Sequence, residues 1–488
     1  MGRGSGFPYC GYFFGTQVKQ LQKRFHGAGR FHGLHGWFSV RLGSEVGGLV
    51  CMFIEKAIRF AYQVGNRFSG LIKGIQALLP GFVEERITDM ILRGEGGSGD
   101  RKLVFRDGCY ENRVAGKGLK AGCNLIGFVF GEFGIGEHLR YAARSCLAEG
   151  IPFSLVNYDK TLHPQADASL AEYISSDNPY HTNIFCMNNE GVMNLHASNP
   201  EIFKDRYNIG YGFWELSDYP DEWLYAMNFM DEIWAPSRYI QEVISEKASV
   251  PVVYMPMAVD FELPGKGSRK DFGIPEEAFV FLFSLDFSSR IHRKNPGAVV
   301  EAFKRAFPGA DRDVVLVIKS KIVDSVAQQV DDYAMLQEWV KGDSRIHLIN
   351  EVYSKDQMLD LINCCDVYVS LHRAEGFGLG MAEAMKMGKA VIATNYSGNT
   401  DFTKSDNACL VDYTLKKVGP EKLYYLQGDS VWADADVGQA VDYMRRLVVD
   451  EGYRRGIGER ARVFMDEKHG FGVVGGRYRK RLGLIGLV

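Results

Sequence analysis

Short apolar runs alternate with stretches of helical periodicity from about residue 119 to the end of the chain. This alternation is typical of βαβ units, in which helices connect parallel strands that are buried on both faces. The pattern predicts a first series of strands at residues 124–130, 153–157, 182–187, 209–214, 232–235 and 252–255. It predicts a second series at residues 279–286, 314–319, 346–349, 366–371 and 390–394. The clearest helical stretches are expected at residues 137–149, 296–307, 357–365 and 439–482.

Two consecutive series of this kind predict an α/β protein with two doubly wound, Rossmann-like domains that face each other across a crevice. A turn rich in proline and glycine near residue 264 separates the two series. We therefore expect an N-terminal extension and linker at 1–118 and a first domain at 119–264. A second domain is expected at 265–488, closed by the C-terminal helices.

Composition narrows the class of protein. A chain of 488 residues is too long for one hydrophobic core and suits two large domains with an extension. The 57 Lys and Arg nearly balance the 60 Asp and Glu, which argues against a chain-wide nucleic-acid binder. The nine cysteines are scattered and form no CxxC pair, so a disulfide scaffold is not expected. A reducing, cytoplasmic location fits this cysteine usage better.

Charge is unevenly distributed, because residues 1–80 contain ten Lys or Arg and only two acidic residues. This segment is also rich in Gly and Phe, and residues 49–62 can form a short amphipathic helix. A basic, aromatic, amphipathic segment can lie on an anionic membrane surface, which predicts peripheral association with the inner face of a membrane. The alternative is an extension that simply keeps its charges in water.

The most informative stretch is residues 370–398, SLHRAEGFGLGMAEAMKMGKAVIATNYSG. A strand is expected to end there in a glycine-rich loop with Glu375, and a helix over about 381–387 is expected to follow with Glu383 in its first turn. Glycines let backbone N–H groups approach a ligand, and a helix start favours phosphate or polarised hydroxyl groups. The two carboxylates can accept hydrogen bonds from hydroxyls at two points of one extended ligand. Taken singly, Glu375 is also compatible with an ordinary loop acid, and Glu383 with a residue that complements the helix dipole.

The segment EGFGLGMAEAM resembles the E-x7-E signature of retaining, nucleotide-sugar-dependent glycosyltransferases of family 4, which have the GT-B fold. The resemblance extends over roughly residues 122–482. It implies that Glu375, Gly376, Phe377 and Gly378 contact the donor sugar and that Glu383 holds the nucleotide ribose.

A second candidate site is DFSSRIHRKNP at residues 286–296, which opens a helix after the first strand of the second domain. Basic side chains beside a helix start suit a diphosphate. Similar enzymes place an Arg and a Lys here to neutralise the leaving nucleoside diphosphate. Lys294 matches the lysine, whereas serines stand at the arginine position, so Arg290 or Arg293 is the candidate substitute. The alternative is a solvated basic turn.

The first domain contributes a glycine-rich loop, GEFGIGE, at residues 131–137. In similar enzymes this loop faces the crevice, which makes Gly134 and Gly136 crevice residues and Glu132 a candidate contact to acceptor hydroxyls. Taken alone, the loop is equally compatible with a plain turn.

Residues 208–236 are dense in aromatic and acidic side chains, a combination that suits carbohydrate or, equally, a packed core. Many related enzymes carry a His near the start of this stretch, where this chain has Trp214 and Glu215. The pattern of Trp214, Glu215, Pro220 and Trp223 resembles a polysaccharide-assembly subgroup of the family, similar to mannosyltransferases.

Together these features predict a retaining glycosyltransferase that moves a hexose from a nucleoside diphosphate sugar to a hydroxyl of a glycan or lipid-linked glycan acceptor. A mannose-type sugar and a GDP-sugar are favoured over a UDP-sugar. No cofactor is expected, and no metal, because neither a His cluster nor a DxD-like motif stands in a clear donor-side position. The alternatives are a non-enzymatic glycan-binding or scaffold subunit with the same fold, and a sugar-nucleotide epimerase or hydrolase.

Overall fold

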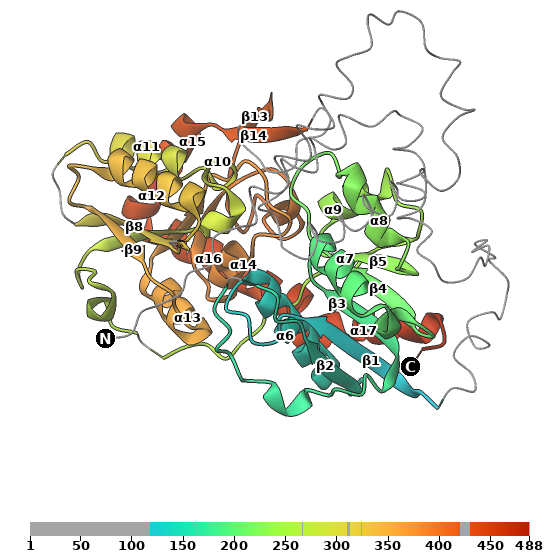
Figure 1. Ribbon diagram of the computed structural model, residues 1–488. Coiled ribbons are helices and arrows are strands. Elements are labelled where there is room, and N and C mark those ends of the chain that lie inside the picture. Colours follow the sequence, from blue (N-terminus) through green and yellow to red (C-terminus); the bar gives the residue numbers. More distant parts are fainter. Residues whose placement is uncertain are drawn as a thin grey trace, which may run out of the picture. The chain divides into compact units, whose positions relative to one another are not determined.

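The computed structural model describes residues 118–161, 163–265, 267–309, 313–323, 325–419 and 430–487. The basic segment 1–80, with its expected amphipathic helix, lies outside the described residues. Within the described part, two six-stranded parallel sheets carry helices on their faces (Figure 1). No helix of this part is long and apolar enough to cross a membrane.

The first sheet has the strand order β2-β1-β3-β4-β5-β6, and every neighbouring pair is parallel. Its strands are β1 (Lys120–Gly127), β2 (Phe153–Asn157), β3 (Tyr180–Cys186), β4 (Tyr207–Tyr211), β5 (Glu232–Ala235) and β6 (Val252–Tyr254). The helices between them are α6 (Gly134–Ala148), α7 (Asn189–Ser198), α8 (Leu224–Met227) and α9 (Arg238–Ser245). The order of the strands reverses between β1 and β3, which is where an open α/β sheet binds ligands.

The second sheet has the order β12-β11-β10-β7-β8-β9 and reverses between β7 and β10. Its strands are β7 (Phe279–Ser284), β8 (Val314–Ser320), β9 (Ile346–Asn350), β10 (Val367–Ser370), β11 (Ala390–Thr394) and β12 (Cys409–Val411). Its connecting helices are α10 (Ile291–Lys294), α11 (Pro296–Ala306), α12 (Ala327–Val340), α13 (Lys355–Cys364) and α14 (Leu379–Lys386). An antiparallel pair of strands follows, formed by β13 (Tyr413–Lys417), which is exposed, and β14 (Val431–Ala435), which is mostly buried.

The predicted fold class, two doubly wound Rossmann-like domains, is confirmed. All eleven predicted strands are present, because their apolar runs fill the sheet interiors. The strand β12 and the antiparallel pair of β13 and β14 were not predicted. β12 has only three residues, and all five residues of β13 are exposed. Neither strand therefore has the continuous apolar run from which a buried strand is predicted.

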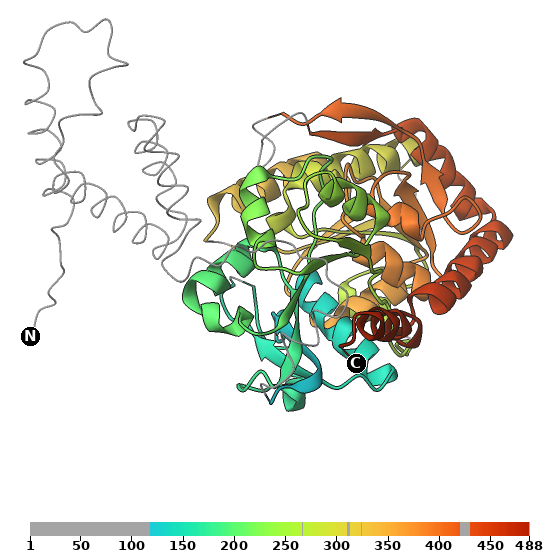
Figure 2. The same ribbon diagram turned by 90° about the vertical axis from the view of Figure 1, so that its right-hand side faces the viewer.

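The C-terminal helices are α15 (Val437–Val449), α16 (Glu451–His469) and α17 (Phe471–Leu484). Helix α16 packs on α14 and β11 of the second sheet, but α17 packs closely on α6 of the first (Figures 1 and 2). A Cβ added at Gly475 would lie 2.2 Å from the Ser145 carbonyl oxygen, so glycine is what permits this approach. The sequence assigned all these helices to the second domain, whereas the chain returns to the first sheet at its end.

Candidate active site

A cavity of about 740 Å³ lies at the carboxyl ends of both sheets, where the loops after the strands of the two domains meet. Parallel sheets bind ligands at this edge because the strand order reverses there. Twelve of the thirteen residues singled out from the sequence line this cavity: Glu132, Gly134, Trp214, Glu215, Arg290, Arg293, Lys294, Glu375, Gly376, Phe377, Gly378 and Glu383. Gly136 does not line it. A Cβ there would stand 2.2 Å from the Gly131 carbonyl oxygen, so Gly136 serves the packing of α6 against the loop.

Glu375 follows β10 and lies among cations. Lys294 Nζ donates a hydrogen bond of 2.5 Å to its Oε1, and Arg293 Nη1 lies 3.4 Å from its Oε2. Burial acts to raise the pKa of this carboxyl, but Lys294 and Arg293 outweigh it and hold the pKa at about 2. Glu375 is therefore ionised at neutral pH. The sequence analysis selected Glu375, Lys294 and Arg293 as site residues, but it did not predict that the two cations pair with Glu375.

Arg293 is buried and connects the two domains. Its Nη1 donates to the Ala374 carbonyl oxygen at 2.8 Å, and its Nη2 lies 3.5 Å from Glu215 Oε1 of the first domain. Burial acts to lower the pKa of the guanidinium, but Glu215 and Glu375 raise it. Arg293 thus orders the Glu375 loop and is already occupied by two carboxylates.

The basic loop after β7 has an unusual backbone. Arg290 (φ 60°) and Asn295 (φ 56°), on either side of the short helix α10, both have a positive φ, and Asn295 is in the left-handed helical conformation. Asn295 is the N-cap residue of α11, but its side chain makes no capping bond and donates instead to the Leu371 carbonyl oxygen at 2.8 Å. That bond ties the basic loop to the end of β10, so Lys294 is positioned beside Glu375.

The glycine loop after Glu375 approaches the first domain. Ser237, at the start of α9, donates a hydrogen bond of 2.7 Å to the Gly376 carbonyl oxygen. Gly378 (φ 101°) adopts a conformation that favours glycine and precedes α14. Phe377 is buried against Phe402, with ring centroids 5.0 Å apart. The loop backbone is therefore held in place at the cavity wall.

Glu383 lies in the second turn of α14, because this helix begins two residues earlier than predicted. Its Oε1 accepts a hydrogen bond from Lys355 Nζ, which also lies 3.5 Å from Glu137 Oε1 in α6. Tyr141 donates to the same Glu383 oxygen at 3.5 Å. Burial raises the pKa of Glu383 in spite of Lys355. Lys355 also lines the cavity, but no motif in the sequence marks this residue.

The sequence analysis selected no site residue at the end of β8. Lys319 and Lys321 line the cavity there, and Lys321 Nζ lies 3.3 Å from Asp286 Oδ2 and 3.1 Å from His163 Nδ1. His163 stacks on Phe133, with centroids 4.3 Å apart. The alternation of lysine and serine in VIKSK was a weak signal, because a charged residue at a strand end is ordinarily solvated.

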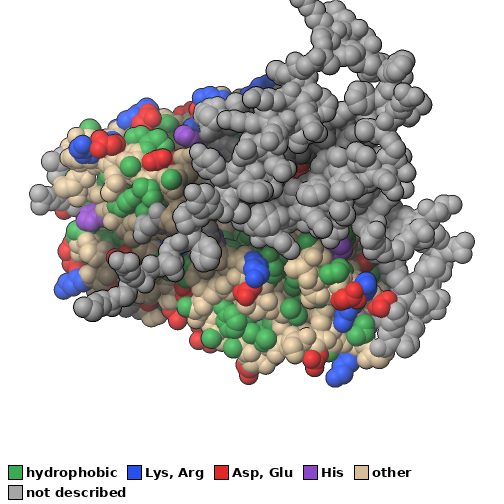
Figure 3. All heavy atoms as spheres, in the orientation of Figure 1, with side chains coloured by type: hydrophobic (Ala, Val, Ile, Leu, Met, Phe, Trp, Pro, Cys, Tyr) green, Lys and Arg blue, Asp and Glu red, His purple; other side chains and the backbone are tan. Residues whose placement is uncertain are grey.

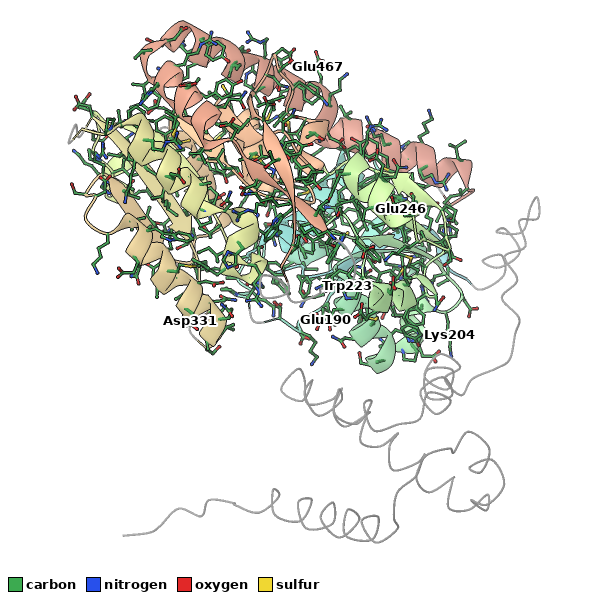
Figure 4. The ribbon with its side chains drawn as sticks, turned by 90° about the horizontal axis from the view of Figure 1, so that it is seen from above. Glu190, Lys204, Trp223, Glu246, Asp331 and Glu467 are labelled. Carbon is green, nitrogen blue, oxygen red and sulfur yellow. The ribbon has the colours of Figure 1, made fainter. Side chains whose placement is uncertain are left out.

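Aromatic residues form the first-domain wall. Trp214 Nε1 donates to the Asp218 carbonyl oxygen at 2.8 Å, and its ring meets that of Trp223 edge-on at 4.9 Å. Both rings are largely buried, so they pack as well as line the cavity. Glu190 and Trp223 line the cavity from the same domain (Figure 4). His372, beside Glu375, is fully buried and bonded to Ser370 and Asn399, which makes it a packing residue.

Among the described residues, no group of three or more His, Cys, Asp or Glu side chains is arranged to hold a metal ion. On the face drawn in Figure 3, basic and acidic side chains are interspersed, so the described residues form no single-sign patch there.

Comparison with known proteins agrees with this geometry. Residues 280–417 match the family described as "Glycosyl transferases group 1", and no curated protein matches the sequence. Sucrose-phosphate synthase from Thermosynechococcus elongatus has a similar structure, with a TM-score of 0.56 and 13% identity over 75% of this chain and 100% of its own. Anabaena HepE in complex with UDP-glucose gives a TM-score of 0.53 and 14% identity over 75% and 100%. The lipopolysaccharide outer core galactosyltransferase WaaB gives 0.50 and 13% over 75% and 99%. Residues 280–417 are therefore similar to the group 1 glycosyl transferases, and the described part of the chain has the GT-B fold.

Proposed function

We propose that this protein is a retaining glycosyltransferase that moves a hexose from a nucleoside diphosphate sugar to a hydroxyl of a glycan or lipid-linked glycan. The observation that carries the proposal is that Glu375 and Glu383 of the E-x7-E motif and Lys294 of the loop after β7 line one cavity between two domains. A nucleotide sugar is an extended ligand, and such a ligand needs separate contacts for its ribose, its diphosphate and its sugar.

Catalysis would consist of positioning and charge stabilisation. Glu375 and the amides of residues 376–378 orient the sugar, while Lys294 and Arg290 stabilise the diphosphate that departs. The departing phosphate accepts the proton of the attacking hydroxyl as the new glycosidic bond forms on the same face of the sugar. Loops of both domains line the cavity. Closure of the domains around the donor would exclude the water that would otherwise hydrolyse it.

We further propose a mannose-type sugar carried by GDP, no requirement for a metal, and surface polysaccharide synthesis at the cytoplasmic face of a membrane. The support is the Trp214–Glu215 and Trp223 pattern and the basic composition of residues 1–80. HepE was crystallised with UDP-glucose, so UDP is the alternative carrier to test.

A thermal-shift screen against GDP, UDP, ADP and dTDP, with and without magnesium, tests the donor. A ligand at a hundred times its Kd stabilises the folded state by about 2.7 kcal/mol. A shift with one nucleotide that is independent of magnesium supports the proposal and names the donor class. The absence of a shift with all four would favour the scaffold alternative.

One observation supports an alternative function as an epimerase or hydrolase. His163 Nδ1 lies 3.9 Å from Asp286 Oδ2 in the cavity, and such a pair can move protons. Release of free sugar or a change of its configuration without any acceptor would favour that function. We expect the transferase instead, with donor consumption that depends on an added glycan acceptor.

A further inference from the structure

Two lysines lie at the carboxyl end of β8. Lys319 is one of the last two residues of the strand, Lys321 directly follows the strand, and both line the cavity. They are 5% and 9% exposed. Charged lysines are rarely so buried unless something neutralises them.

Lys319 has an incomplete environment. Its Nζ donates to the carbonyl oxygens of Ser320 at 3.1 Å and Glu351 at 2.7 Å, and it lies 4.7 Å from the centre of the Tyr353 ring. In the described part of the chain, no carboxylate lies within the 4.0 Å of an ion pair to this ammonium. Neutral carbonyl groups satisfy its hydrogen bonds but do not balance its charge.

The neighbouring cations differ from Lys319 in this respect. Lys294 pairs with Glu375, Lys355 pairs with Glu383, and Lys321 lies 3.3 Å from an Asp286 oxygen. Burial, followed by repulsion from Lys321, lowers the pKa of Lys319 to about 8, although Asp286 and Glu351 act in the opposite direction. A buried ammonium without a direct ion pair destabilises the folded protein, and an anion bound next to it would reduce that cost.

The position of the pair indicates which substrate brings the anion. Lys321 Nζ lies 3.1 Å from His163 Nδ1 and 3.5 Å from the Glu132 carbonyl oxygen, both in loops of the first domain. Lys321 also pairs with Asp286, at the start of the loop after β7 to which the donor diphosphate is assigned, so the lysine lies between that loop and the first domain. The end of β8 therefore faces the loops that the acceptor would contact.

We propose that Lys319 and Lys321 form a second phosphate subsite, which binds a phosphate group carried by the acceptor. The acceptor is then a phosphorylated sugar or a lipid-linked phosphate rather than a neutral glycan. This inference rests on the proposed transferase function, and it narrows the acceptor class.

Calorimetric titration of the full chain tests the subsite. The protein is saturated with the nucleoside diphosphate that it prefers, so that the donor site is filled, and inorganic phosphate is then titrated. We expect Lys319→Met to weaken phosphate binding at least about tenfold and to leave nucleotide affinity unchanged. Lys294→Met should do the reverse. Lys204→Met, at an exposed lysine outside the cavity lining, is the matched control and should change neither.

Glucose 6-phosphate and farnesyl phosphate, titrated in the same way, separate the two sources of phosphate. The source that binds more tightly, and loses affinity in Lys319→Met, identifies the acceptor class. Thermal unfolding of the free protein is the folding control. We expect Lys319→Met to keep or raise Tm, because it removes an unbalanced charge, and Lys319→Arg to retain phosphate binding.

Two results would overturn the subsite. One is phosphate affinity in Lys319→Met equal to that of the wild type. The other is loss of nucleotide affinity in Lys319→Met as large as in Lys294→Met, which would assign the end of β8 to the donor. If the wild type binds no nucleotide, the transferase proposal fails separately, and phosphate titration of the free protein with the same variants still tests the subsite.

Discussion

The two glutamates of the E-x7-E motif lie in the same cavity wall and are buried to a similar extent, at 7% exposed for Glu375 and 5% for Glu383. Their carboxyl pKa values nevertheless shift in opposite directions: that of Glu375 is lowered to about 2, and that of Glu383 is raised. Burial alone would raise both. The difference therefore comes from the cations around each carboxylate.

Glu375 forms ion pairs with two cations, Lys294 and Arg293. Of these two, Arg293 also contacts a second carboxylate, Glu215, at 3.5 Å. Glu383 shares its one lysine, Lys355, with Glu137. Burial is the main cause that raises the pKa of Glu383, and repulsion from Glu137 adds to it, although Glu137 also pairs with Arg140 at 2.7 Å. Lys355 alone does not outweigh this burial. The E-x7-E motif thus identifies Glu375 and Glu383, but residues outside the motif set the pKa values of their carboxyl groups.

Removing the charge of Glu375 should have the largest effect. Glu375→Gln leaves Lys294 and Arg293 as buried cations without their main carboxylate, and the sugar loses a charged acceptor. We expect the transfer rate to fall roughly a thousandfold, as measured by kcat with the preferred donor. Glu246→Gln, at an exposed position labelled in Figure 4, is the control and should retain full activity. Activity above a tenth of that of the wild type in Glu375→Gln would contradict the assigned role.

These residues also show what the sequence could and could not predict. The fold was predictable because each buried strand is a continuous apolar run, and Glu375 and Glu383 were predictable because glycines and a helix start surround them. Three cavity lysines could not be predicted: Lys319, Lys321 and Lys355. Each lies at or after the end of an ordinary strand, and only the folded structure brings it to the cavity beside the first-domain loops. The packing of α17 on α6 could not be predicted either, because the sequence of an amphipathic helix does not show which surface its apolar face contacts.

The low pKa of Glu375 predicts an acid-sensitive contribution to stability. Its folded pKa of about 2 lies below its ordinary value of 4.5, so the contribution is fully present above pH 4.5 and is lost as the pH falls towards 2. Its size is roughly 3 kcal/mol. Urea unfolding from about pH 6 to about pH 3 should show the wild type losing its advantage over Glu375→Gln. A difference between the two proteins that stays constant with pH would contradict the pKa.

Glu383 should respond in the opposite sense. Its raised pKa means that its ionised form is disfavoured in the folded state, so the associated stability is present below pH 4.5 and is lost as the pH rises through the folded pKa. Glu383→Ala should therefore destabilise the protein less than Glu375→Gln at neutral pH. Nucleotide affinity should nevertheless fall roughly tenfold to a hundredfold, because the ribose loses a charged hydrogen-bond acceptor. Calorimetric Kd values provide the measurement, and an unchanged Kd would remove Glu383 from the ribose site.

Glu215 should give the smallest effect, since Arg293 keeps its other partners when this carboxylate is neutralised. The contact to Arg293 spans 3.5 Å, and the Glu215 side chain is 33% exposed, so the pair contributes about 1 kcal/mol or less. We expect Glu215→Gln to lower kcat by about threefold while Kd for the nucleotide stays the same, because the bond orders the Glu375 loop from the first domain without touching the nucleotide. Glu301→Gln, which breaks an exposed pair with Arg305 at 3.0 Å, is the matched control and should change neither value. A loss in Glu215→Gln as large as that in Glu375→Gln would instead assign Glu215 a direct contact with the sugar.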